Sequence, residues 1–137
     1  MVQSKMIYQG ELRVAATHGP SGASLHTDAP IDNHGKGESF SPTDLVATGL
    51  GSCMATVMGI HAQKENLDLK GMRITVEKLM TATGPRKIRQ LKVRLELPHP
   101  LKPEAADRLK EIALNCPVAL SLNADIRVDL DFIVPNS

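Results

Sequence analysis

The stretch SPTDLVATGLGSCMATVMGIHAQKEN, from Ser41 to Asn66, decides the fold. Its first residues carry the signals of a helix start. Ser41 is a favoured N-cap, the proline that follows needs no N–H in the first turn, and Asp44 stands where a capping-box acid bonds back to the cap. The stretch therefore predicts one long helix that runs to about Asn66 and carries Cys53 near its middle.

Much of this predicted helix has small side chains. Glycine costs about 1 kcal/mol relative to alanine inside a helix, so the glycines at 49, 51 and 59 indicate that another element, most simply a second helix, comes close to the backbone. At about 100° per residue, four apolar side chains fall on the same side as Cys53. They are Val46, Leu50, Val57 and Ile60. We therefore expect the Cys53 thiol to be largely shielded from water.

Length and composition limit the classes of protein. A chain of 137 residues predicts one domain over 1–137. Sixteen basic and fifteen acidic residues leave a net charge of +1, which disfavours nucleic acid and anionic membranes as partners. The start of the sequence has no apolar signal region, and no apolar run is expected to reach the roughly 20 residues of a membrane span. We expect a cytoplasmic protein, in which two cysteines form at most a transient disulfide.

Apolar periodicity and turn residues predict the remaining elements. Alternation predicts strands, and an amphipathic pattern predicts a helix that ends at Cys116, where Pro117 starts a second short helix. Cys116 would then lie at a helix N-terminus, where the macrodipole favours a thiolate. The predicted elements are strands over 5–14, 23–27, 72–80, 91–97 and 126–134, a loop over 27–40, and a helix over 103–115.

The two cysteines have two interpretations from residues alone. A free cysteine is usually a small buried hydrophobe. Here both thiols fall in or beside helices and on apolar sides, which favours a joint chemical role. Spacing does not show that Cys53 and Cys116 meet.

The pattern SPTDLVATGLGSCMATV, followed about sixty residues later by NCPVALSL, resembles the osmotically inducible protein C and organic hydroperoxide resistance (OsmC/Ohr) family. The resemblance covers essentially the whole chain. It implies an α+β fold with antiparallel sheets around two central helices. It also implies an intertwined homodimer with active sites at the subunit interface.

The same resemblance implies a function. Cys53 would attack a hydroperoxide to give a sulfenic acid, and Cys116 would resolve it as a disulfide that a dithiol later reduces, with no cofactor. A resolving thiol of this kind prevents over-oxidation. The alternative is a catalytically weak or inactive dimer that binds an apolar small molecule.

The alternative rests on departures from the family motif, in which an N-terminal arginine and a glutamate at the helix start hold the thiolate. No arginine lies between Val14 and Lys70, and strand alternation predicts that Arg13 points away from the core. The remaining nearby bases do not match the motif. They are Lys36, His18, His26 and His34.

The acid of the motif is also replaced. Thr43 stands where family peroxidases have glutamate, and Asp44, nine residues before Cys53, falls on the opposite side of a straight helix. Asp44 is therefore expected to cap the helix, and Glu38 in the preceding loop is the other candidate acid. Two cysteines and two histidines could in principle hold zinc, but no CxxC or HxxxH spacing is present, so no metal is predicted. His61 is expected to be a boundary residue.

Overall fold

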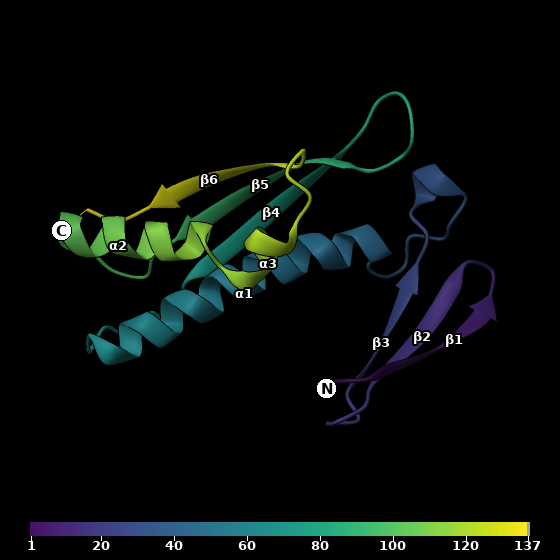
Figure 1. The fold of residues 1–137 in the computed structure, drawn as a ribbon, viewed down its shortest axis with the longest axis horizontal. Helices are drawn as coiled ribbons and strands as arrows, with labels where there is room; N and C mark the ends of the chain where they lie inside the picture. The colour runs from purple at the N-terminus through teal and green to yellow at the C-terminus, as the bar shows by residue number, and fades with distance from the viewer. Residues whose placement is uncertain (137) are drawn as a thin grey trace. The chain divides into compact units, whose positions relative to one another are not determined.

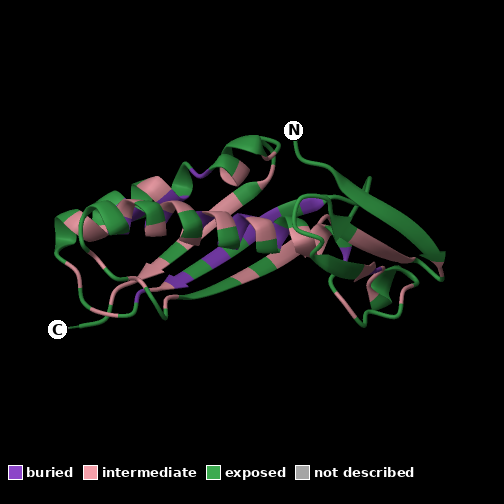
Figure 2. Cartoon of the chain, turned by 90° about the horizontal axis from the view of Figure 1, so that it is seen from below, coloured by how far each residue is buried: buried purple, intermediate pink, exposed green. Residues whose placement is uncertain are grey.

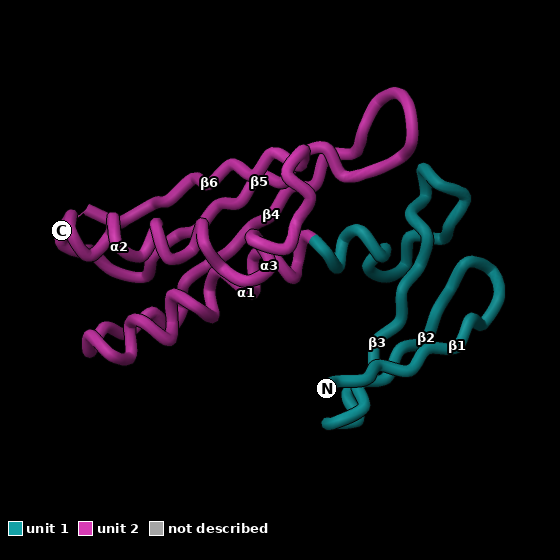
Figure 3. Tube along the Cα trace, viewed as in Figure 1, with its two compact units in different colours: residues 1–46 teal, residues 47–137 magenta. Residues whose placement is uncertain are grey.

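The computed structural model describes residues 1–136, which form two compact units (Figure 3). The first comprises residues 1–46 and the second residues 47–137. Each is described by itself below, and a single domain over 1–137 stays a prediction.

The first unit contains a three-stranded antiparallel sheet in the order β1-β2-β3 (Figure 1). Its elements are β1 (Ser4–Gly10), β2 (Arg13–His18), β3 (Ser24–Asp28) and the 3-10 helix η1 (Ile31–Asn33). The prediction of one strand over 5–14 is wrong, because the chain reverses at Glu11 and Leu12, whose φ angles are 52° and 63°. The returning strand after the turn at 18–22 is confirmed as β3.

This sheet has no apolar core of its own. Among residues 1–46 the buried side chains are those of Asp28 and Ser41, both polar. Several large apolar side chains of the unit are exposed instead (Figure 2). They include Met6, Ile7, Tyr8 and Leu25.

The second unit holds most of a long helix and a second sheet. The elements are α1 (Pro42–Lys64), which begins in the first unit, β4 (Arg73–Met80), β5 (Ile88–Glu96), α2 (Pro103–Leu114), α3 (Pro117–Ser121) and β6 (Arg127–Ile133). Strand order is β4-β5-β6, with β4 and β5 antiparallel but β5 and β6 parallel. The expectation of purely antiparallel sheets is therefore wrong here. A parallel pair needs a crossover connection, and α2 and α3 provide it.

The core lies between the helices and one face of this second sheet (Figures 1 and 2). Leu91 and Leu95 of β5 are fully buried, as are Met54 and Met58 of α1 and Leu109 of α2. Alternate residues of β5, such as those at 92 and 94, are exposed and charged. The predicted alternation of this strand is confirmed.

By length and composition α1 could cross a membrane, since it has 23 residues and a mean hydropathy of 1.4. The expectation that no apolar run reaches such a length is therefore wrong. One side of α1 is buried against the core through Leu50, Met54 and Met58, and the core helix of a soluble protein passes the same test.

Candidate functional site

The start of α1 is fixed by a capping box. The backbone N–H of Asp44 donates to Ser41 Oγ at 3.0 Å, and the N–H of Ser41 donates to Asp44 Oδ2 at 2.9 Å. Two orphan donors of the helix terminus are thus satisfied reciprocally. The predicted capping function of Asp44 is confirmed, and its role as a supporting acid stays a prediction.

Gly51 lets α1 approach the second sheet closely. A Cβ at this position would lie 2.9 Å from Ile74 Cγ2 and 2.9 Å from Val76 Cγ2, both on β4. At Gly49 and Gly59 a Cβ would meet nothing within 4 Å. The close neighbour of Gly51 is therefore a strand of the same chain and not a second helix, whereas the other two glycines leave open space on α1.

The structure brings Cys53 and Cys116 together, although 63 positions separate them in the sequence. Both are free thiols, and Cys53 lies close enough to Cys116 to raise the pKa of the Cys116 thiol. Cys116 belongs to the buried core cluster, and Cys53 packs against that cluster while remaining half-buried. The two thiols are thus neighbours in a largely apolar setting, which sequence spacing did not show.

Cys116 is the N-cap of α3, as the position of Pro117 predicted. Its Sγ accepts a hydrogen bond from the N–H of Ala119 at 3.4 Å. Burial nevertheless raises the pKa of the Cys116 thiol; the N–H of Ala119 opposes this, and contact with Cys53 adds to it. The N–H groups of the helix N-terminus do favour a Cys116 thiolate, but loss of solvation outweighs them, so the net shift of the pKa is upward.

In the first unit, Arg13 is bound to a buried carboxylate. Its Nε donates to Asp28 Oδ1 at 2.7 Å and its Nη2 to Asp28 Oδ2 at 2.9 Å. Asp28 is 2% exposed and also accepts the backbone N–H of Glu38 at 3.0 Å. The hydrogen bonds from Arg13 lower the pKa of Asp28 against the effect of burial, with help from the Glu38 N–H. That Arg13 points away from an apolar core stays a prediction, but its guanidinium is held by a buried carboxylate.

The candidate acid Glu38 lies next to this ion pair, with its Oε2 3.6 Å from Arg13 Nη2. Lys36, another base considered from the sequence, contacts Glu11 at 2.7 Å. Sequence reasoning missed Asp28. It lies directly opposite Arg13 in the β2–β3 register, and only that register brings the pair together.

Within residues 1–136 no group of three or more His, Cys, Asp or Glu side chains is arranged to hold a metal ion. His61 is half-buried on α1 and lines a surface groove together with residues that precede and begin α2.

Comparisons with known proteins agree with this architecture. The model of the family described as OsmC-like protein matches residues 35–131. A crystal structure of a candidate osmotic stress induced and detoxification response protein from Psychrobacter arcticus is 42% identical, with a TM-score of 0.93 and 96% of each chain covered. A search of curated proteins found no match.

More distant structures share the fold. An organic hydroperoxide resistance protein OsmC from Legionella pneumophila has a TM-score of 0.78 at 19% identity and covers 98% of this chain and 97% of its own. The organic hydroperoxide resistance protein OhrB of Bacillus subtilis has a TM-score of 0.70 at 16% identity and covers 96% and 97%.

Proposed function

This chain belongs to the OsmC-like protein family, and we propose that it is a thiol-dependent peroxidase that reduces organic hydroperoxides. Cys53 is the attacking residue and Cys116 the resolving residue. The observation that carries the proposal is that the two free thiols are neighbours, with Cys116 in the core cluster of the second unit and Cys53 packed against that cluster. The names of the fold relatives, which concern hydroperoxide resistance, supply the substrate class.

The reaction balances with these two residues and a dithiol. The Cys53 thiolate attacks the terminal oxygen of the hydroperoxide, the O–O bond breaks, and the alcohol leaves after taking a proton. Cys53 is then a sulfenic acid. The sulfur of Cys116 attacks the Cys53 sulfur, water leaves, and a disulfide forms. A dithiol reductant returns both thiols and becomes a disulfide itself.

Burial supports this division of roles. Cys116 is 0% exposed and its pKa is raised by burial, so its nucleophilic thiolate is disfavoured in the reduced protein. Cys53 is half-buried and therefore open to a substrate from solvent. The proximity of the two thiols supports a role for Cys116 in trapping a sulfenic acid on Cys53 before further oxidation.

The same proposal includes a homodimer in a reducing compartment, such as the cytoplasm. The exposed apolar side chains of the first sheet and the open space beside Gly49 and Gly59 support a second copy of this chain as the partner.

The test begins with fully reduced protein and one equivalent of cumene hydroperoxide. Both thiols should be consumed, and mass spectrometry of a non-reducing digest should find a Cys53–Cys116 disulfide. Cys53→Ser should abolish peroxide consumption, whereas Cys116→Ser should accumulate sulfenic or sulfinic acid on Cys53. Persistence of both free thiols after this treatment overturns the peroxidase proposal.

A second candidate is a weak or inactive dimer that binds an apolar small molecule. It is favoured by the side chains already engaged elsewhere: Arg13 with Asp28, and Asp44 with the helix cap. Alkylation of Cys53 by iodoacetamide at neutral pH, measured in Cys116→Ser, separates the two. Alkylation faster than that of a free cysteine peptide supports the peroxidase, and slower alkylation supports the binding protein.

A further inference from the structure

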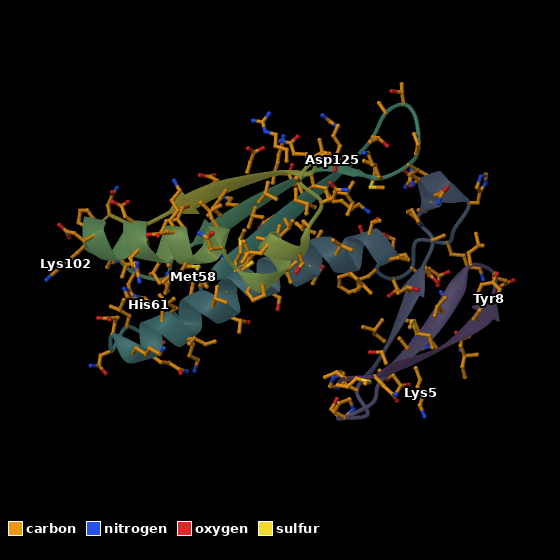
Figure 4. The ribbon with its side chains drawn as sticks, viewed as in Figure 1. Lys5, Tyr8, Met58, His61, Lys102 and Asp125 are labelled. Atoms are coloured by element: carbon orange, nitrogen blue, oxygen red, sulfur yellow. The ribbon has the colours of Figure 1, made fainter. Side chains whose placement is uncertain are left out.

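A groove with a volume of about 680 Å³ lies beside the end of α1 in the second unit. One wall is formed by His61, Glu65 and Leu67. The other wall runs from His99 to Arg108, through the loop that leads into α2. Figure 4 labels one side chain from each wall, His61 on α1 and Lys102 just before α2.

His99 connects the segments that carry these two walls. Its Nε2 is 2.6 Å from the carbonyl oxygen of Asp68, in the turn that follows α1. Its Nδ1 is 3.1 Å from the carbonyl oxygen of Pro100, in its own loop. A carbonyl oxygen only accepts hydrogen bonds, so both contacts are made together only when both ring nitrogens carry a proton. The geometry is therefore that of an imidazolium.

Hydrogen bonds, one neighbouring charge and burial shift the pKa of His99 in opposite directions. Its hydrogen bonds to the carbonyls of Pro100 and Asp68 raise the pKa of His99, and the negative charge of Asp68 adds to this, while burial opposes it. The Asp68 carboxylate is held nearby, since its Oδ1 accepts the N–H of Lys70 at 2.9 Å. The other titratable and charged groups that line the groove are His61 and Glu65 from the end of α1, and Lys102, Glu104 and Arg108 from the start of α2.

We propose that His99 is a proton-operated clasp that ties the turn after α1 to the loop before α2 and thereby controls the width of the groove. A neutral imidazole can donate from only one nitrogen, and when that nitrogen is Nδ1 the lone pair of Nε2 faces the carbonyl oxygen of Asp68, so the bond that ties the turn to the loop is replaced by repulsion. The turn over 67–72 is then released from the loop, and the groove opens.

The direction of the pH dependence follows from the contacts. The folded-state pKa of His99 lies above the unfolded value of about 6.5. The stabilisation from the clasp is therefore fully present below about pH 6.5 and is lost as the pH rises through the folded-state pKa. The groove is closed in acid and open in base.

The experiment follows histidine ring signals and amide exchange by NMR in the full chain, as a function of pH. His99 should titrate above the ordinary histidine value of about 6.5. The amides of Leu67 and Met72, which bond to Ala62 O at 2.8 Å and Leu69 O at 3.0 Å, report on the turn. Their protection factors should fall about fivefold as the pH passes the His99 transition, the equilibrium factor of one hydrogen bond of ordinary net strength.

Two variants make the assignment specific. His99→Gln should remove the pH dependence of the two protection factors, and the matched control His61→Gln should retain it. Asp68→Asn keeps the carbonyl but removes the carboxylate, so the transition should move to lower pH. The proposal is overturned if His99 titrates at or below about pH 6.5, or if the turn amides show the same pH response in His99→Gln as in the unmodified chain.

Discussion

Gly51→Ala, two residues before Cys53, tests how closely α1 approaches the second sheet. The new methyl would lie 2.9 Å from Ile74 Cγ2 and 2.9 Å from Val76 Cγ2. The best separation of two carbon atoms is about 3.5–4.0 Å, so the contact is repulsive. Both neighbours are β-branched and stiff at χ1, which means that neither can rotate away without strain.

Two effects of opposite sign determine how much Gly51→Ala changes the free energy of unfolding. Alanine gains about 1 kcal/mol over glycine inside a helix, and overpacking a filled site costs about 1–3 kcal/mol. We therefore expect Gly51→Ala to lower the free energy of unfolding by about 1 kcal/mol, since the middle of the overpacking range exceeds the propensity gain. For a chain of this size that lowers Tm by about 3 °C.

Gly49→Ala is the matched control, because it lies on the same helix and its Cβ would meet nothing within 4 Å. Because only the higher helix propensity of alanine acts there, Gly49→Ala should raise the free energy of unfolding by about 0.5–1 kcal/mol. Urea unfolding followed by circular dichroism at two protein concentrations measures both variants. Equal or greater stability of Gly51→Ala relative to Gly49→Ala refutes the close approach. A destabilised Gly49→Ala that also dissociates in sedimentation would identify that side of α1 as a subunit contact.

Two further predictions concern the first unit. Ser41→Ala removes the side-chain acceptor of the Asp44 N–H and should lower stability by about 1 kcal/mol in urea unfolding; an unchanged midpoint would mean that the cap adds nothing. The hydrogen bonds from Arg13 hold the folded-state pKa of Asp28 below the unfolded value of about 3.9. The ionised Asp28 therefore stabilises the fold above about pH 3.9, and this stabilisation is lost as the pH falls through the lowered folded-state pKa. Asp28→Asn should lack this acid-dependent loss in unfolding curves recorded down a pH series, and parallel losses in both proteins would contradict it.

Local signals were sufficient for the helix that carries the candidate site. The start of α1 follows from Ser41, a proline and Asp44, which bond within one turn of each other. Pro117 likewise fixed Cys116 at a helix start, because proline cannot continue the preceding helix. Such features were predictable since every participating group lies within a few residues in the sequence.

The hairpin between β1 and β2 shows why the first strands were not predictable. Tyr8 pairs with Val14, and Leu12 between them continues the even-numbered apolar alternation across the turn. The turn residues Glu11 and Leu12 adopt positive φ although neither is among the residue types that favour it. Periodicity therefore continued through a reversal that a single glycine, Gly10 with a φ of 84°, marks in the sequence.

Contacts set by register escape sequence reasoning in the same way. Arg13 meets Asp28 because β2 and β3 pair in one particular register, and a shift by one residue would place the two on opposite faces. Cys53 and Cys116 meet because a helix and a crossover connection pack on the same sheet. The parallel pairing of β6 with β5 depends on that crossover. The alternation of apolar and polar residues within β6 is the same whether the strand runs parallel or antiparallel to its neighbour, so it does not predict the direction.

The Arg13–Asp28 ion pair is not sufficient to stabilise the first unit. Ordering a residue costs about 1–2 kcal/mol of backbone entropy, and burial of apolar surface is the main compensation. Residues 1–46 bury no large apolar side chain, while Met6, Ile7 and Tyr8 are 64%, 72% and 63% exposed. The Arg13–Asp28 pair orients the strand end and the loop that follows, but one ion pair cannot replace a core. The stability of this unit must therefore come from surface that covers its exposed apolar side chains, which is the strongest physical reason for the second copy of the chain in our proposal.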